Sequence, residues 1–540
     1  MRKTILALQY DFDSGYHVGD GTSTDAVDAI LARDGQGRLV VRGTSLAGVL
    51  RAEATRLASA IDPGTKGLCI KAEGESAALN DACRCPVCHL FGTANPGHHG
   101  SSHASRLVVH NAYPGPDSES SSTVIDRVAI DRDTGAALEH RKFNLEVGFS
   151  GPFVGLLELN DGSDEDCGLL GALLAELEAG RINLGGGSSG GLGWMRGRAI
   201  DVYELDLENL DTLCVYLQTE TLLGAPPSLV PYKASIPLPA VPERSEPGSP
   251  SFVSITCRLA FSEYELINDP AEAVLNGTHG YHVEGCDGKP CLPGFSLRGS
   301  MRSHCERILR TMSLALACRE LSSNGNEGRR ACASVIRDLL ENGHELSPRL
   351  VLENSCEACR LFGSVYAAGR IRVGNGQLIK EGSDARILDL VAIDRFTGGA
   401  LDKAKYDLRP ERKTTYEFEL ALRDPEEWMI GLVLLAIRDL TEGNLPIGGH
   451  TRKGFGQAEG EICNWIEGRV NPVQEAPSGA TQDRNGIYTT WTWNGLPLKG
   501  SPGTFASAAA DDLVEMQDRY LAPLMKMAES SVHGTAGNES

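Results

Sequence analysis

The sequence predicts an α+β protein made of two tandem ferredoxin-like domains. Two observations predict this fold class. The first is an internal repeat, because four segments of the first half recur in the same order in the second half. The second is the expected order of elements in the first copy: strand, helix, strand, strand, helix, strand. That order is typical of ferredoxin-like sheets.

The repeat is specific because the matched segments occur in the same order and are separated by nearly the same number of residues. The paired segments are residues 43–51 and 294–302, 85–92 and 356–363, 128–138 and 391–401, and 184–193 and 447–456. The displacements lie between 251 and 271 residues, which is too regular for four chance matches. The chain therefore holds a duplicated domain.

The elements of the first copy follow from the spacing of its apolar residues. Strict alternation predicts a strand, and apolar residues three and four apart predict a helix. In chain order we expect a strand over Thr4–Phe12, a helix over Ser45–Ala60, strands over Arg106–Asn111 and Phe143–Gly151, a helix over Gly168–Glu178 and a last strand over Ala199–Tyr203.

Prolines set the boundary between the copies, since they interrupt helices and strand pairing. The expected parts are a first domain at 1–223, an extended proline-rich linker at 224–250, a second domain at 251–470 and a C-terminal extension at 471–540. The extension begins as a polar segment around Trp491 and Trp493. It continues as an amphipathic helix over Asp511–Glu529 and ends in a disordered tail.

Composition argues against a membrane-spanning chain and for a reducing compartment. No run reaches roughly 18 apolar residues, and the first residues lack the apolar core of a secretory signal. The 15 cysteines, with Cys-x-x-Cys spacing, indicate metal binding rather than disulfides, so we expect a cytoplasmic protein. The net charge of −21 disfavours binding to nucleic acid on average. A local basic groove remains compatible with it, because phosphates respond mainly to charges within about 10 Å.

Each copy carries a cysteine knuckle that predicts one structural zinc per domain. In the first copy the expected ligands are Cys69, Cys83, Cys85 and Cys88. In the second copy they are Cys356 and Cys359 with His304 and Cys318, for which Cys305 and Cys332 are alternatives. Buried free thiols are the competing interpretation. Four good ligands leave no open position, which argues against a catalytic zinc.

The first repeated segment places a serine at an expected helix N-terminus in each copy. Such a serine can cap the helix and do nothing more. A helix N-terminus also attracts anions, and arginines follow within two turns. The candidate phosphate-binding residues are Ser45 and Arg51 in the first copy and Ser296, Arg298 and Arg302 in the second.

The glycine-rich loops are further candidates for phosphate contact, because glycine allows positive φ and leaves amide groups open to an anion. The first loop follows an expected helix and lacks Gly-Lys-Ser/Thr, which excludes dinucleotide and P-loop fingerprints. The candidates are Gly186, Gly187, Ser188 and Ser189, acting mostly through the backbone, and Gly449, His450, Arg452 and Lys453, where side chains contribute. His450 fits a base or phosphate contact better than a catalyst.

The four repeated motifs together resemble the RAMP superfamily, the backbone subunits of type III CRISPR effectors. The motifs are Ser-Leu-x-Gly-x-x-Arg, Cys-x-x-Cys-x-Leu-Phe-Gly, Ile-Asp-Arg-x-Thr-Gly and the glycine-rich loop, present twice in this order over most of residues 1–470. The chain is most similar to the fused two-copy proteins of the III-D and III-E branches.

The resemblance implies two RRM-like domains that hold guide crRNA and assemble with other type III subunits. Each copy would push a β-hairpin thumb, around Asp-Arg-x-Thr-Gly, through the duplex of guide and target single-stranded RNA. Thr134 and Thr397 would then lie against unstacked bases. A plain surface hairpin is the competing interpretation.

The resemblance also implies a metal-dependent endoribonuclease in the first copy. Asp28 lies where family members carry the aspartate that cuts target RNA, and Asp25 is the alternative. A divalent cation such as Mg²⁺ would offset the phosphate charge. Asp28 lies six residues before Asp34, and the residue six positions before Asp287 in the second copy is Tyr281, which cannot replace a carboxylate. We therefore expect the second copy to bind RNA without cutting it, with a displaced Asp269 as the alternative cutting residue.

Two other functions remain open from the sequence. One is a purely structural crRNA-binding subunit, with cleavage performed by another chain. The other is a zinc scaffold that uses its tandem domains for protein contacts without RNA.

Overall fold

The computed structural model describes residues 2–61, 85–93, 103–115, 118, 120–132, 134–218, 250–285, 288–319, 329–382, 386–470, 481–485, 488–496, 519–527 and 529. The expected linker, apart from Pro250, and the expected tail at 530–540 lie outside these residues.

The first copy contains a mainly antiparallel six-stranded sheet in the order β2-β6-β1-β8-β7, with β3 beside β6. Its elements in chain order are β1(Arg2–Phe12), α1(Gly43–Ile61), α2(Pro86–Phe91), β2(Leu107–Val109), β3(Tyr113–Pro114), β4(Ser120–Ile130), β5(Ala137–Ser150), β6(Phe153–Asn160), α3(Asp164–Glu178), β7(Ile182–Asn183), the 3₁₀ turn η1(Ser188–Gly190), β8(Trp194–Asp206) and α4(Leu210–Gln218). The chain order strand, helix, strand, strand, helix, strand is that of a ferredoxin-like sheet.

Burial explains why these residues form this sheet. Strand β1 lies in the middle, with Leu6 and Leu8 in the core beneath α1 and α3 and Ile5 in a smaller core. Helix α3 begins at Asp164 because Ser163 and Asp166 form a capping box. The predicted first strand, both helices and the last strand are confirmed as β1, α1, α3 and β8, with bounds that differ from the predicted ones by a few residues.

One predicted strand of the first copy was wrong in its role. Phe143–Gly151 falls on β5, which pairs with β4 to form a separate hairpin rather than a strand of the main sheet. The missing sheet strand is β6, which pairs with both β1 and β2. Only Gly151 and Pro152 separate β5 from β6, and this Gly-Pro pair is the turn signal that the sequence prediction overlooked.

The second copy repeats this arrangement. Its sheet has the order β12-β17-β9-β18-β20-β19, with β13 beside β17, so β12-β17-β9-β18 matches β2-β6-β1-β8. Its elements are β9(Phe252–Phe261), β10(Tyr264–Glu265), α5(Pro270–Leu275), β11(Gly280–Tyr281), α6(Gly294–Met312), α7(Cys332–Glu341), α8(Pro348–Glu353), α9(Glu357–Phe362), β12(Ile371–Val373), β13(Gln377–Lys380), β14(Leu388–Ile393), β15(Ala400–Arg409), β16(Glu411–Arg412), β17(Thr415–Arg423), α10(Glu427–Thr441), η2(Thr451–Lys453) and β18(Ala458–Val470).

The C-terminal extension belongs to the second sheet. Strands β19(Thr481–Asn485) and β20(Tyr488–Leu496) form a hairpin, and β20 pairs with β18. Trp491 and Trp493 are buried in the main core, so the expectation of a polar segment around them was wrong. Residues 519–527 are helical, within the predicted helix Asp511–Glu529, and Tyr520 and Leu524 join the same core.

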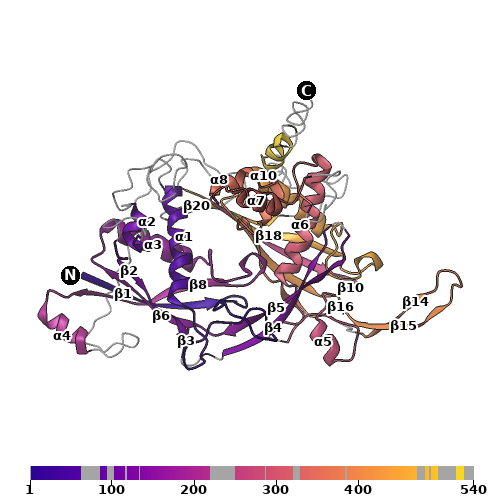
Figure 1. Ribbon diagram of the computed structural model, residues 1–540, viewed down its shortest axis with the longest axis horizontal. Coiled ribbons are helices and arrows are strands. Elements are labelled where there is room, and N and C mark those ends of the chain that lie inside the picture. Colours follow the sequence, from indigo (N-terminus) through magenta and orange to yellow (C-terminus); the bar gives the residue numbers. More distant parts are fainter. Residues whose placement is uncertain are drawn as a thin grey trace.

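Each copy also carries a long hairpin outside its main sheet. Hairpin 1 is β4 with β5, and hairpin 2 is β14 with β15. Hairpin 2 extends away from the body of the molecule, whereas hairpin 1 lies along the second copy (Figure 1). Near its tip, Arg132 of hairpin 1 pairs with Glu306 of α6 at 2.6 Å.

The copies also meet through the first glycine-rich loop. A Cβ at Gly190 would lie 3.0 Å from Phe295, and one at Gly191 would lie 2.4 Å from Asn375, so this contact requires glycine. Beside it, Arg56 of α1 reaches Asp424 and Tyr488 of the second copy. Among the described residues, no helix combines the length and apolar character needed to cross a membrane.

Candidate functional site

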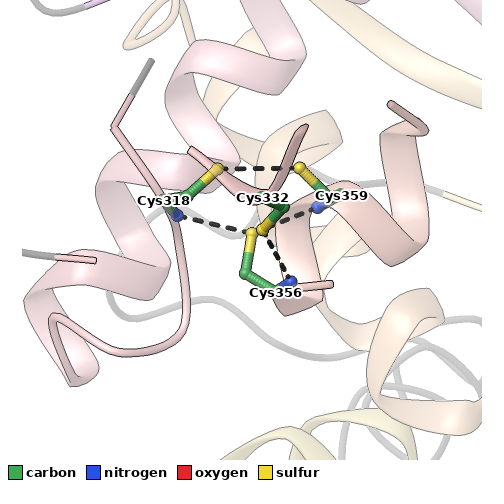
Figure 2. Close-up of side chains that lie close together, drawn as sticks. All are labelled: Cys318, Cys332, Cys356 and Cys359. Carbon is green, nitrogen blue, oxygen red and sulfur yellow. Dashed lines mark hydrogen bonds between the residues drawn. The ribbon is translucent and has the colours of Figure 1, made fainter. Parts of the chain in front are cut away.

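The second copy brings four buried cysteines together (Figure 2). Cys356 and Cys359 come from the start of α9, Cys332 begins α7, and Cys318 follows α6. Their sulfur atoms all lie within 4.8 Å of one another, and the sulfurs of Cys318 and Cys359 are 3.6 Å apart. Tetrahedral zinc–sulfur bonds of about 2.3 Å place sulfurs about 3.8 Å apart, so the site fits one zinc ion.

Electrostatics within this cluster also favour metal binding. Hydrogen bonds from Cys332, Cys356 and Cys359 lower the pKa of the Cys318 thiol. Backbone N–H groups point at the sulfurs as well: that of Cys359 lies 3.4 Å from the Cys356 sulfur, and that of Cys356 lies 3.1 Å from the Cys332 sulfur. Such N–H···S contacts stabilise thiolate ligands, because they offset part of the sulfur charge.

The predicted ligand His304 was wrong, and the alternative Cys332 takes its place. His304 Nε2 contacts Asp439 Oδ2 at 2.6 Å, and Arg307 donates to His304 Nδ1. Both ring nitrogens are therefore committed. Cys305, the other alternative, is buried with its sulfur directed at the carbonyl of Leu432.

The knuckle of the first copy has the same local geometry. Cys85 caps α2, and its sulfur accepts from the N–H of Cys88 at 3.4 Å. Both cysteines are buried, whereas the predicted ligands Cys69 and Cys83 lie outside the described residues. An arginine reaches the second sulfur in each copy, Arg51 to Cys88 at 3.5 Å and Arg302 to Cys359 at 3.6 Å.

The predicted serines do not cap their helices. Helices α1 and α6 begin at Gly43 and Gly294, two residues before Ser45 and Ser296. The first N–H of each helix instead donates to an asparagine side chain, Asn111 or Asn375, at 2.8 Å. Helix capping by serine was therefore wrong, and both serines are half-buried within the first turn.

A cavity of about 410 Å³ opens beside the cysteine cluster, between hairpin 1 and α6. Its polar lining includes Arg132, Arg298, Arg302 and Ser189, and none of the described residues that line it carries a carboxylate. Arg302 and Arg132 both pair with the buried Glu306. The cavity thus joins hairpin 1, the first glycine-rich loop and the start of α6.

Two half-buried arginines at this junction have no acidic partner among the described residues. Burial lowers the pKa of Arg298 to about 10. Its Nη2 donates to the carbonyl of Phe362, whereas its buried Nε has no hydrogen-bond partner among the described residues. Burial also lowers the pKa of Arg127 of β4 to about 10, and its buried Nε and Nη2 lack partners there. Arg127 lies 4.4 Å from the ring of Phe295. Buried, unpaired guanidinium N–H groups of this kind favour a bound anion.

Sequence reasoning named Arg298 but missed Arg127. The sequence signal for Arg127 was weak, because this residue lies before the repeated Asp-Arg-x-Thr-Gly motif and is not part of it. Arg132 belongs to that motif, yet only the fold shows that it contacts the other copy.

The glycine-rich loops use part of their backbone internally. The N–H of Gly186 donates to the carbonyl of His17 at 2.8 Å, and that of Gly449 donates to Leu266 at 2.7 Å. These two amides are therefore not directed at an outside anion. Gly187, Ser188 and Ser189 form the turn η1 against the second copy, where Ser189 reaches the cavity.

The second loop meets both hairpins. His450 has a positive φ of 57°, and its ring stacks on Tyr406 of hairpin 2. Burial lowers the pKa of His450. Lys453 donates to the Tyr406 hydroxyl at 2.7 Å, and Arg452 reaches the carbonyl of Thr134 near the tip of hairpin 1 at 3.4 Å.

The tips of the two hairpins differ in their surroundings. Thr134 lies against the second copy through Arg452. Thr397 bonds to Asp394 within its own turn, beside Phe396, which is 99% exposed. Hairpin 2 therefore presents an uncovered apolar tip.

Asp28 is exposed and tied to the base of hairpin 1. Its Oδ2 accepts from the backbone N–H of Asn144 at 2.9 Å, and its own N–H donates to Asn144 Oδ1 at 2.8 Å. This reciprocal pair fixes the carboxylate beside β5. Asp25 lies three residues earlier on the same exposed loop.

The second-copy residue at this position was wrongly expected to be Tyr281. Isolated bridges Arg33↔Leu39 and Glu284↔Pro290 show that this segment keeps the displacement of 251 residues. That displacement aligns Asp28 with His279. His279 contacts Asp407 of β15, the counterpart of Asn144.

The arrangement as a whole can hold a zinc ion, attract phosphate through two half-buried arginines and present a carboxylate at a hairpin base. No curated protein matches the chain. A model of the RAMP superfamily matches residues 10–196 and 276–459, one region in each copy and together more than half of the chain. The chain therefore belongs to the RAMP superfamily, which indicates a CRISPR-associated, RNA-binding protein.

Proposed function

We propose that this chain is a two-copy backbone subunit of a type III CRISPR ribonucleoprotein. It binds guide crRNA along both copies, accepts complementary target RNA and cuts that RNA beside Asp28. Hairpins 1 and 2 act as the thumbs that interrupt the guide–target duplex. Other effector subunits are its partners, and base pairing rather than the protein reads the sequence.

The observation that carries RNA binding is a pair of half-buried arginines, Arg127 and Arg298, without acidic partners among the described residues. A buried guanidinium N–H that is unsatisfied costs free energy unless an anion completes it. Nε and Nη2 of Arg127 and Nε of Arg298 are such groups. Both arginines lie where hairpin 1 meets α6, so a guide phosphate there would join the two copies. This local charge outweighs the acidic average of the chain.

The geometry at Asp28 suits cleavage by an adjacent 2′-hydroxyl. The carboxylate is exposed and held at the base of a thumb, next to the place where a target nucleotide would be displaced. Asp28 belongs to no group of three metal ligands among the described residues. A Mg²⁺ ion there would be held by one carboxylate together with phosphate oxygens and water, which is how Mg²⁺ usually binds. Such an ion would offset the charge that develops on the phosphate.

The first test is RNA retention by the purified full-length chain. We expect the wild type to carry RNA, with absorbance at 260 nm exceeding that at 280 nm. Arg127→Met and Arg298→Met remove charge but keep side-chain volume. Each should weaken binding of single-stranded RNA about 10-fold or more and reduce its salt dependence by about one phosphate contact. Arg349→Met, an exposed residue of α8, is the control. Unchanged retention in both variants would contradict the proposal.

The second test is cleavage of a 5′-labelled RNA complementary to the guide that copurifies with the particle. Asp28→Ala should remove one cut, and EDTA should do the same. Asp28→Asn keeps the acceptor for the Asn144 N–H but lacks the charge. If Asp28→Asn still cuts, Asp28 only positions the loop. Asp25→Ala tests the alternative residue in the same assay.

The alternative function is a non-catalytic subunit that holds crRNA while another chain cuts. The internal use of the Gly186 and Gly449 amides and the single carboxylate at Asp28 are compatible with it. Full retention of every cut in Asp28→Ala and Asp25→Ala particles, with RNA binding intact, would favour this alternative.

A further inference from the structure

The bases of the two hairpins share one framework. The equivalent residues, 263 positions apart, are Asp126 and Asp389, Lys142 and Lys405, and Asn144 and Asp407. In each hairpin the first and third of these residues lie directly opposite one another across the strand pair. In each hairpin the lysine pairs with the first aspartate, at 2.8 Å in the first copy and 3.1 Å in the second.

The loop residue that docks on this framework differs between the copies. In the first copy Asp28 on the loop pairs with Asn144 on the strand. In the second copy His279 on the loop pairs with Asp407 on the strand. The N–H of His279 also donates to the carbonyl of Asp407 at 3.0 Å, which fixes the loop. The position therefore keeps two polar partners but exchanges an acid–amide pair for a histidine–aspartate pair.

The geometry of this pair leaves one imidazole nitrogen available. His279 Nδ1 contacts Asp407 Oδ1, and this hydrogen bond lowers the pKa of the Asp407 carboxyl. The His279 side chain is 63% exposed, and its Nε2 has no hydrogen-bond partner among the described residues. The backbone N–H of Asp407 also lies 3.4 Å from Nδ1, but the contact with the carboxylate is the shorter and the charged one. A carboxylate that accepts from Nδ1–H sets the tautomer in which Nε2 carries the lone pair. Because the pair is exposed, it contributes little to stability.

We propose that the second copy is a metal-independent ribonuclease site in which His279 acts as general base and Asp407 positions it. Nε2 of His279 takes the proton of a ribose 2′-hydroxyl, and the 2′ oxygen forms a bond to the adjacent phosphorus. The bond from phosphorus to the 5′ oxygen breaks, and that oxygen takes a proton from water. The products are a 2′,3′-cyclic phosphate and a 5′-hydroxyl, and no further reactant is needed. This inference rests on the proposed function, since target RNA must lie along the second copy.

The test uses the full-length particle with its copurified guide and a 5′-labelled complementary RNA. The background is Asp28→Ala, so that only the second-copy cut is followed. We expect a cut that persists in EDTA and leaves a 2′,3′-cyclic phosphate. His279→Ala should slow it by about 10²–10⁴-fold, the usual contribution of a general base. Asp407→Asn should slow it less. Glu353→Gln, at an exposed acid of α8 away from the hairpin, should leave it unchanged.

A paired exchange separates catalysis from structure. His279→Asp combined with Asp407→Asn imports the first-copy arrangement of Asp28 and Asn144. We expect the second cut to become sensitive to EDTA in this variant. An EDTA-resistant cut that survives His279→Ala would overturn the inference. So would the absence of a second cut while target RNA still binds in a mobility-shift assay, although the proposed function would stand. Loss of RNA binding by the wild type would overturn both.

Discussion

At the scale of single residues, the buried carboxyl of Glu265 has a property that the sequence does not predict. Glu265, at the end of β10, is buried, and its Oε2 has no hydrogen-bond partner among the described residues. Burial raises its pKa to about 7, although Thr414 and Tyr416 donate to its other oxygen. The carboxyl is therefore protonated more readily in the folded chain than in the unfolded chain, whose pKa is near 4.5. Nothing in the sequence around Glu265 indicates this.

The raised pKa predicts that stability falls as pH rises. The contribution of Glu265 is complete below the unfolded pKa near 4.5 and is lost as pH passes through about 7. Glu265→Gln should therefore raise the free energy of unfolding at pH 8 by about 1–3 kcal/mol and have little effect at pH 5. Urea midpoints at the two pH values measure this. Glu263→Gln, at an exposed surface pair, should show no such difference.

The residue at the second-copy hairpin base shows what a sequence count misses. Matching the spacing from Asp28 to Asp34 with the spacing back from Asp287 selected Tyr281. The 251-residue displacement between the two helix starts, Gly43 and Gly294, selects His279 instead. The bridges that follow the loop, Arg33↔Leu39 and Glu284↔Pro290, keep the second spacing. Backbone pairing fixes the register of such a loop, and a spacing between two exposed acids does not.

At the scale of elements, the sequence predicted the repeated motifs better than the strands between them. Helices α1 and α3 were predictable because their apolar residues recur at helical spacing. Strand β6 was missed because it follows β5 almost directly. The cysteine knuckle was predictable from Cys356 and Cys359, which lie three residues apart in the chain. The other two cysteines of the cluster, Cys318 and Cys332, come from distant segments that only the fold brings together.

The knuckle predicts a direct measurement of zinc content. Cys332→Ser should lower the bound zinc by one ion per chain, because it removes one of four sulfur ligands. His304→Gln should leave the zinc content unchanged, since His304 bonds to Asp439 and Arg307 instead. Elemental analysis of dialysed protein gives the numbers. Zinc lost from His304→Gln but kept in Cys332→Ser would show that the cluster is not the site.

At the scale of the whole molecule, a buried charge network fixes the two copies against each other. Arg56 contacts Glu53, Glu176, Asp424 and Tyr488, and the first two carboxylates are almost fully buried. Arg423 of the second copy pairs with Glu53 from the other side, at 2.9 Å. Glu53 thus pairs with cations from both copies, whereas Glu176 pairs with Arg56 and Arg181 of the first copy.

Removing Arg56 should be costly for this reason. Arg56→Ala leaves Glu53 and Glu176 with fewer cations, and the loss of one partner of a buried pair costs about 3–5 kcal/mol. We expect a lower urea midpoint, with hydrogen exchange increasing first along α1 and β20. Arg349→Ala breaks only an exposed pair within α8 and should change the midpoint little. Equal stabilities for the two variants would show that the network does not hold the copies together.

The contact of the first glycine-rich loop with Phe295 and Asn375 has a consequence for how such a particle is built. The contact itself consists of a backbone turn, one aromatic ring and one amide side chain, so on its own it would hold two separate chains together only weakly. Covalent linkage replaces their concentration in solution with an effective concentration set by the linker, on the order of millimolar. A weak contact then stays closed at any expression level. Under the proposed function, the fusion would also fix the order of Asp28 and His279 along the RNA, which free subunits of two kinds would have to establish by selective pairing.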